Sequence, residues 1–203
     1  NMAGFCITDD EVCKKASRDE IIRRLYAAKC AVRQGQSDGA DEYKIELIMS
    51  KLGLSEDMRV CAAAARQKSE TTEAPAMAIE LPDGRTVTGK TTSLLGACSA
   101  VLINALKALA GIPKETLLIP PTIIEPIQKL KVSHMGNKNP RLHTDELLIA
   151  LSICATTDKT AALALEQLDK LRGSEAHSTV ILARVDENVF KKLGINLTCD
   201  PVY

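Results

Sequence analysis

The first third of the chain has the hydrophobic spacing of amphipathic helices. Between positions 8 and 70, apolar residues recur every three or four positions and polar residues fill the intervals. This period places one apolar stripe on each helix. The segment 17–20 (Ser-Arg-Asp-Glu) has the form of a capping box, which predicts a helix start, and Gly35 predicts its end. The stripe of this first helix consists of Ile21, Leu25, Ala28 and Val32.

Two further helices are predicted before the pattern breaks. One spans positions 41–52, where a glycine follows, and the next starts at Ser55. Residues 69–75 have no hydrophobic period and contain a proline, which is typical of a linker. We therefore expect a helical subdomain over residues 1–72 and an α/β subdomain over residues 73–203.

The remainder of the chain alternates strand-like and helix-like segments. Residues 77–81 and 85–88 alternate apolar and polar side chains around a Pro-Asp-Gly turn, which predicts a β-hairpin. Two later strands are predicted over 177–183 and 195–199. Helices that alternate with strands imply an α/β fold in three layers, with a small sheet and helices on its faces. The predicted helices cover about 92–110, 123–131, 144 onward, 158–173 and 186–194.

The composition argues against nucleic-acid and membrane partners. Lys and Arg together number 26, as do Asp and Glu, so no net charge attracts a polyanion. Aromatic residues make up only 2% of the chain, too few for stacking on bases. The most apolar stretch, 94–112, is interrupted by Asn104 and Lys107, so we expect no membrane span.

The cysteines indicate a reducing compartment. Their number is odd, no pair forms a C-x-x-C motif, and most lie in apolar helical surroundings. We therefore expect reduced thiols in a cytoplasmic protein rather than a disulfide framework. The seven cysteines are Cys6, Cys13, Cys30, Cys61, Cys98, Cys154 and Cys199.

One segment fits a phosphate-loop pattern letter for letter. Residues 84–91 read Gly-Arg-Thr-Val-Thr-Gly-Lys-Thr, which matches G-x-x-x-x-G-K-[ST]. A phosphate loop must curl its amides around an anion, whereas this segment is already used as the second half of the predicted hairpin. We favour the hairpin, and keep a weaker alternative in which Lys90, Thr91 and the first amides of the following helix hold an anion.

The polar segment 132–146 is the strongest candidate for a functional site, because it lies between two apolar elements. Its histidines, His134 and His143, are candidates for proton transfer. Lys138 and Arg141 are candidates for binding a phosphate or carboxylate. The alternative is a loop made rigid by side-chain hydrogen bonds around its proline, with an exposed basic surface.

Two other residues bear on the site. His177 begins a predicted strand and is a candidate to face the same anion, although a hydrogen-bonded structural role fits it equally well. Cys98 lies in a helix with no histidine nearby in sequence, so we expect a packing thiol rather than a nucleophile. The sequence contains no H-x-E or HExxH motif, so we expect no metal, and it specifies no cofactor.

Several segments together resemble the C-terminal part of an uncharacterised bacterial protein family, a domain of unknown function. The resemblance extends over essentially the whole chain. It implies a cytosolic protein of several subdomains, about twice this length, with a phosphate-loop-like N-terminal region missing here. It implies no catalytic residues. The segments that carry it are 1–6, 89–96, 120–127, 133–136 with 139–143, and 175–179.

Two functional hypotheses follow. In the first, the chain is the C-terminal portion of a larger cytosolic enzyme that binds an anionic, nucleotide-like small molecule. In the second, it is a non-catalytic assembly domain whose small-residue faces at 58–65 and 96–110 pack subunits together. Under both hypotheses we expect a homo-oligomer and a missing N-terminal region of the same polypeptide as a partner.

Overall fold

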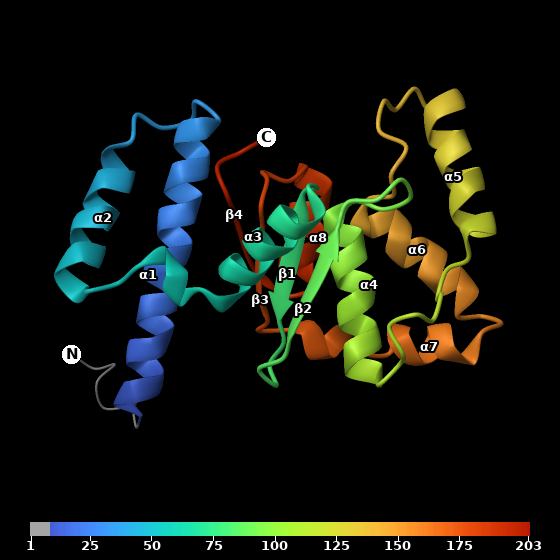
Figure 1. Ribbon diagram of the computed structural model, residues 1–203, viewed down its shortest axis with the longest axis horizontal. Helices are drawn as coiled ribbons and strands as arrows, with labels where there is room; N and C mark the ends of the chain where they lie inside the picture. Colours follow the sequence, from blue (N-terminus) through green and yellow to red (C-terminus); the bar gives the residue numbers. More distant parts are fainter. Residues whose placement is uncertain (1–8) are drawn as a thin grey trace.

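The structure is a computed structural model that describes residues 9–203. The segment 1–6, which contributes to the family resemblance and contains Cys6, lies outside the described residues. Figure 1 shows two helices at one end of the molecule, a small sheet in the middle and further helices at the other end. The helices are α1 (Asp10–Arg33), α2 (Ala40–Leu52), α3 (Val60–Thr72), α4 (Ala97–Ala110), α5 (Pro121–Ser133), α6 (Thr144–Cys154), α7 (Lys159–Leu165) and α8 (Arg184–Lys192).

The helical character predicted for the first third is confirmed, but the first helix begins earlier than predicted. Asp9 is its N-cap and accepts hydrogen bonds from the amides of Glu11 and Val12. Ser17 therefore lies inside α1, where its hydroxyl donates to the carbonyl of Cys13, one turn back. The predicted capping box at 17–20 is wrong because Asp9 caps the helix eight residues earlier.

The sheet contains four strands in the order β2-β1-β3-β4. β1 pairs antiparallel with β2 and with β3, and β3 pairs parallel with β4. The predicted hairpin is confirmed, with Ala76 opposite Lys90 and Glu80 opposite Thr86. The strands are β1 (Ala76–Glu80), β2 (Thr86–Lys90), β3 (Glu175–Ser178) and β4 (Asn196–Cys199).

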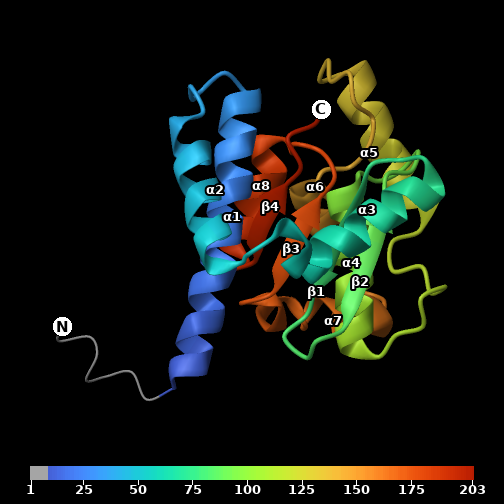
Figure 2. The same cartoon turned by 60° about the vertical axis from the view of Figure 1, so that its left-hand side comes forward.

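Alternation along the strands divides the sheet into two faces. Met77 and Ile79 belong to the main hydrophobic core, which also holds buried residues of α4 and α6. Ala78 belongs to a separate cluster with Cys61 and Ala65 of α3. One face of the sheet is thus covered by α3 and α1, and the other by α4 and α8 (Figures 1 and 2). The predicted three-layer α/β fold with N-terminal helices is confirmed.

Gly89 explains why the phosphate-loop pattern occurs in a strand. A Cβ atom at this position would lie 2.3 Å from the backbone nitrogen of Val101, so only glycine lets β2 pack this closely on α4. Residues 86–90 are paired with β1 along their whole length. The glycine and its neighbours therefore serve hairpin and helix packing, and they form no curled loop of amides.

Two further element boundaries that differ from prediction matter for the site. α4 begins at Ala97 instead of Thr92, because the Thr92 hydroxyl accepts hydrogen bonds from the amides of Leu94 and Leu95 and forms a turn first. The strand predicted over 177–183 ends at Ser178, where a side-chain hydrogen bond to Val180 turns the chain. Both shifts place loops beside the start of α4.

Many of the small residues in the faces proposed for subunit packing are buried within the chain. Ala62 and Ala65 of α3, and Ala105 of α4, are fully buried inside the hydrophobic clusters of this chain. The sequence-based boundary at 72/73 stays a prediction, although α3 packs on β1, β2 and β3.

Among the described residues, no helix combines the length and the apolarity needed to cross a bilayer.

Candidate functional site at the start of helix α4

The structure brings three predicted site residues to one small cavity. The cavity has a volume of about 170 Å³ and lies between the first turn of α4, the loop 139–143 and the loop 180–183. Thr91, Arg141 and His143 line it, together with Asn139 and Asp186. Of the predicted site residues, these three therefore line one cavity.

The loop that carries Arg141 and His143 is anchored by the residue between them. Leu142 is buried and forms a parallel bridge with Leu95. Its amide donates to the carbonyl of Leu94, and its own carbonyl accepts from the hydroxyl of Ser99 at 2.8 Å. Leu142 is thus fixed in place, and Arg141 and His143 line the cavity on either side of it.

A buried lysine holds the same loop from the other side. The Lys131 ammonium donates to the carbonyl of Arg141 at 2.7 Å and to the Glu146 carboxylate at 2.6 Å. Glu146 in turn accepts from the amide of His143 at 2.9 Å. Only 3% of the Lys131 side chain is exposed, so this cation serves the loop and not a ligand.

His143 is paired with Asp186, a residue that the sequence analysis did not assign to the site. The Nδ1 atom of His143 lies 2.9 Å from Oδ2 of Asp186. The other carboxylate oxygen accepts from the amide and the hydroxyl of Thr144, each at 2.9 Å. The carboxylate is buried and fixed, whereas the imidazole keeps 28% exposure at the cavity. Such an arrangement orients the ring and leaves Nε2 for proton transfer.

Arg141 supplies the positive charge of the cavity. Its Nε donates to the carbonyl of Thr92 at 2.7 Å, and its amide donates to the side chain of Asn139. Among residues 9–203, the terminal nitrogens of the guanidinium make no hydrogen bond, so both are available to an anion. The one hydrogen bond from Nε fixes the orientation of the guanidinium group.

The first turn of α4 supplies backbone donors. Gly96 is the N-cap and offers no side-chain acceptor, so within the described residues the first amides of α4 have no side-chain cap, and Ala97 and Cys98 both line the cavity. The positive end of a helix dipole favours an anion at this place. Burial raises the pKa of the Cys98 thiol well above its ordinary value, with Asp186 adding to the shift, so the thiol stays neutral. The packing role expected for Cys98 fits this environment.

The other predicted residues lie elsewhere. His134 and Lys138 are exposed at the end of α5 and in the loop after it, away from the cavity lining. Lys90 neighbours Thr91, but strand alternation directs it away from the α4 face that Gly89 occupies. His177 is fully buried on the opposite face of the sheet.

His177 belongs to a closed cluster between the sheet and the N-terminal helices. Its Nδ1 lies 2.8 Å from the Thr198 hydroxyl, its Nε2 lies 3.3 Å from Asp200, and its ring packs edge-on against Tyr26. Arg66 binds both oxygens of Asp200, at 2.6 and 3.1 Å. Burial lowers the pKa of His177, and Asp200 only partly opposes that shift. Burial alone would raise the pKa of Asp200, but His177 and Arg66 hold it well below its ordinary value.

Arg59 completes this closed cluster and was missed by the sequence analysis. Its guanidinium is buried and donates to Glu175 at 2.6 Å, to Thr198 at 2.8 Å, and to the carbonyls of Ala176 and Asn196 at 2.8 Å each. Each of the three guanidinium nitrogens thereby donates at least one hydrogen bond, and together these bonds join the start of α3 to β3 and β4. No local pattern marks an arginine just before a helix as buried.

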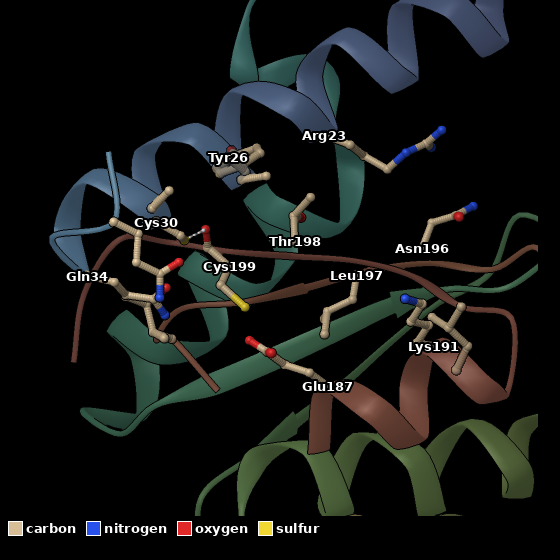
Figure 3. A pocket seen from close by; sticks show the side chains of 15 residues that line it. Arg23, Tyr26, Cys30, Gln34, Glu187, Lys191, Asn196, Leu197, Thr198 and Cys199 are labelled. Carbon is tan, nitrogen blue, oxygen red and sulfur yellow. Dashed lines mark hydrogen bonds between the residues drawn. The ribbon is translucent and has the colours of Figure 1, made fainter. Parts of the chain in front are cut away.

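A second and larger cavity lies between α1, β4 and α8 (Figure 3). Its volume is about 430 Å³, and none of the predicted site residues lines it. Cys30 donates through its thiol to the carbonyl of Cys199 across this cavity. Burial raises the pKa of Cys30 to about 11 and that of Cys199 to about 12, so both thiols are neutral near pH 7. Reactive thiolate chemistry is therefore disfavoured here.

Within residues 9–203, no group of three or more His, Cys, Asp or Glu side chains is arranged to hold a metal ion.

Residues 9–203 thus form a small α/β fold with a helical N-terminal pair and a cavity at the start of helix α4. The chain belongs to the family described as "Domain of unknown function DUF1846": residues 57–203 match its C-terminal domain and residues 1–53 match its N-terminal domain. The predicted membership in an uncharacterised bacterial family is confirmed.

Streptococcal proteins of this family are similar to the chain along its whole length. A "UPF0371 protein" of Streptococcus thermophilus (strain ATCC BAA-491 / LMD-9) is 52% identical over 203 residues, and so is one of Streptococcus pneumoniae (strain CGSP14). The match covers all of this chain but only 41% of each relative. The chain therefore corresponds to less than half of these proteins.

Proposed function

We propose that the cavity at the start of α4 binds the phosphate or carboxylate group of an anionic small molecule. The observation that carries the proposal is the convergence of the uncapped α4 amides, the Arg141 fork and the oriented His143 on one cavity. A phosphate oxygen accepts from amides and from guanidinium in the same geometry. The Thr91 hydroxyl adds a neutral donor on the same wall.

The size of the cavity defines how much of a ligand it holds. Cavities that enclose a whole drug-sized ligand have volumes of about 300–1,000 Å³. The present cavity, with about 170 Å³, fits one anionic group, and the rest of a nucleotide-like molecule would extend outward. That outer part would meet the portion of the longer family proteins that this chain does not include.

His143 is the residue we propose for proton transfer, rather than His134. Asp186 fixes its Nδ1, so Nε2 is the position from which a proton moves to or from a bound group. In this proposal the longer family protein is an enzyme, Arg141 and the α4 amides bind the anion, and His143 acts as acid or base.

Calorimetric titration of inorganic phosphate, pyrophosphate, AMP and ATP tests the proposal. We expect saturable binding of at least one of these anions by this chain or by the longer family protein. The Arg141→Met variant should weaken it at least tenfold, which is the loss typical of a charged hydrogen bond. Lys138→Met is the matched control, because it removes a cation from the same loop but outside the cavity. Equal loss of affinity in the two variants would overturn the proposal. So would the absence of binding both in this chain and in the longer family protein.

A further inference from the structure

Helix α2 carries more apolar surface than its packing uses. Its buried side is formed by Met49, with Ile45 beside it, which pack against α1. Ile48 and Leu52 lie one helical turn apart on an adjoining side and are 47% and 57% exposed. A surface helix normally presents a polar face to water, so a second apolar side indicates a missing neighbour.

This free apolar side borders a groove. A hollow of about 570 Å³ lies between the first half of α1 and the end of α2. Cys13, Ser17 and Ile21 form its α1 wall, and Leu52 forms its α2 wall. We call this hollow the α1–α2 groove.

The first half of α1 has no other support within the described residues. It extends past α2, with no further element beside it (Figures 1 and 2). Of residues 10–18, all but Cys13 are exposed. A few helical turns without tertiary contacts are marginal in water. We therefore expect the first half of α1, which forms one wall of the groove, to be stabilised by a further packing contact.

The family comparison indicates which part of the longer protein could occupy the groove. Residues 1–53, which contain both α1 and α2, match the N-terminal domain of the family, and that match ends at the end of α2. The longer relatives contain more than twice the length of this chain. We propose that, in the longer family protein, the portion of the N-terminal domain not contained in this chain packs into the α1–α2 groove. The two helices would then be the docking edge of that domain.

Cys13 is a native reporter for this interface, because its side chain lines the groove. The experiment measures its alkylation rate by N-ethylmaleimide and mass spectrometry, each time relative to the rate in urea-unfolded protein. We expect at least tenfold protection in the longer family protein and little protection in this chain. A cysteine introduced as Ser152→Cys, on the exposed side of α6, is the control and should react equally in both.

Leu52→Glu tests the groove directly, since it places a charge on the α2 wall without disturbing a buried residue. In the longer protein, this variant should restore at least half of the Cys13 reactivity seen in this chain, with the helical circular dichroism retained. Equal Cys13 rates in the two unmodified proteins would overturn the proposal. So would protection in this chain that grows with its concentration, because a second copy would then be the occupant.

Discussion

Two histidines of this chain each face an aspartate, in opposite environments. His177 and Asp200 are enclosed between β3, β4 and the N-terminal helices, with Arg66 binding the carboxylate and no part of the imidazole exposed. His143 and Asp186 lie at a cavity, with the carboxylate buried and the imidazole partly open. The same pair of residue types thus joins elements in one region and faces solvent in the other.

In both pairs the aspartate lies beside an imidazole. The two pairs differ in the solvent exposure of that imidazole, which is 28% for His143 and 0% for His177. In the closed cluster every nearby cation has a protein partner, as Arg59 illustrates with four hydrogen bonds. At the cavity, the Nε of Arg141 donates to the protein, and the two terminal guanidinium nitrogens make no hydrogen bond within residues 9–203. We infer that the first region contributes to stability and the second to binding.

The largest expected effect is the loss of Arg59. Arg59→Met leaves Glu175 without one cation and removes the donors to Thr198 and two carbonyls. Breaking a buried ion pair typically costs about 3–5 kcal/mol, and the partial exposure of Glu175 places the expected loss near the lower end. Urea unfolding followed by circular dichroism measures it.

Arg141→Met is the matched variant at the cavity. It should change the unfolding free energy by less than about 0.5 kcal/mol, as exposed substitutions usually do. Similar losses of stability in the two variants would remove the distinction between the regions.

The next effect concerns turnover rather than stability. His143→Gln and Asp186→Asn both disrupt the pair at the cavity, and both should lower turnover of a substrate by the longer family protein about 100-fold, the lower range for general acid–base catalysis. Phosphate affinity should change much less than turnover, because the α4 amides and Arg141 remain. A loss of affinity without any loss of turnover would contradict the role given to His143.

A third prediction uses the pKa shift of His177. Because burial lowers that pKa, the unfolded chain binds the proton at higher pH than the folded protein does. The unfolding free energy should therefore fall as the pH drops below about 6.5, by up to about 1.4 kcal/mol per pH unit. His177→Gln should abolish this slope between pH 6.5 and 5, and the exposed His134→Gln should keep it. An unchanged slope in His177→Gln would contradict the prediction.

The architecture could be predicted because it depends on local patterns. Alternation and a turn sequence predicted β1 and β2, and glycines marked the ends of α1 and α2. The starts of α1 and α4 were missed because a competing cap at Asp9 and a competing turn at Thr92 decide them. Those competitions depend on neighbouring backbone conformation, which a hydrophobic pattern does not encode.

The candidate site could be predicted only in part. Polar residues between apolar elements pointed to Arg141 and His143, which share the cavity. Asp186 was predicted only as the first residue of a helix, and its contact with His143 spans 43 residues, which no local spacing reveals. His177 could not be excluded from sequence because a one-residue change of strand register decides which face of the sheet it occupies.

The smallest expected effect comes from a cation beside the cavity. Lys90→Met should change phosphate affinity less than twofold, because the strand directs Lys90 away from the α4 side. Titration calorimetry under the conditions used for Arg141→Met measures it. A tenfold loss of affinity would mean that Lys90 reaches the anion and that the binding site includes residues beyond the present cavity lining.

The most direct test compares both histidines in one sample. Nuclear magnetic resonance of the imidazole side chains, recorded during a pyrophosphate titration, reports on His143 and His177 at the same time. The account predicts that the His143 resonances shift saturably while those of His177 stay unchanged. Unchanged resonances of His143 at saturating pyrophosphate, or equal shifts of both rings, would contradict it.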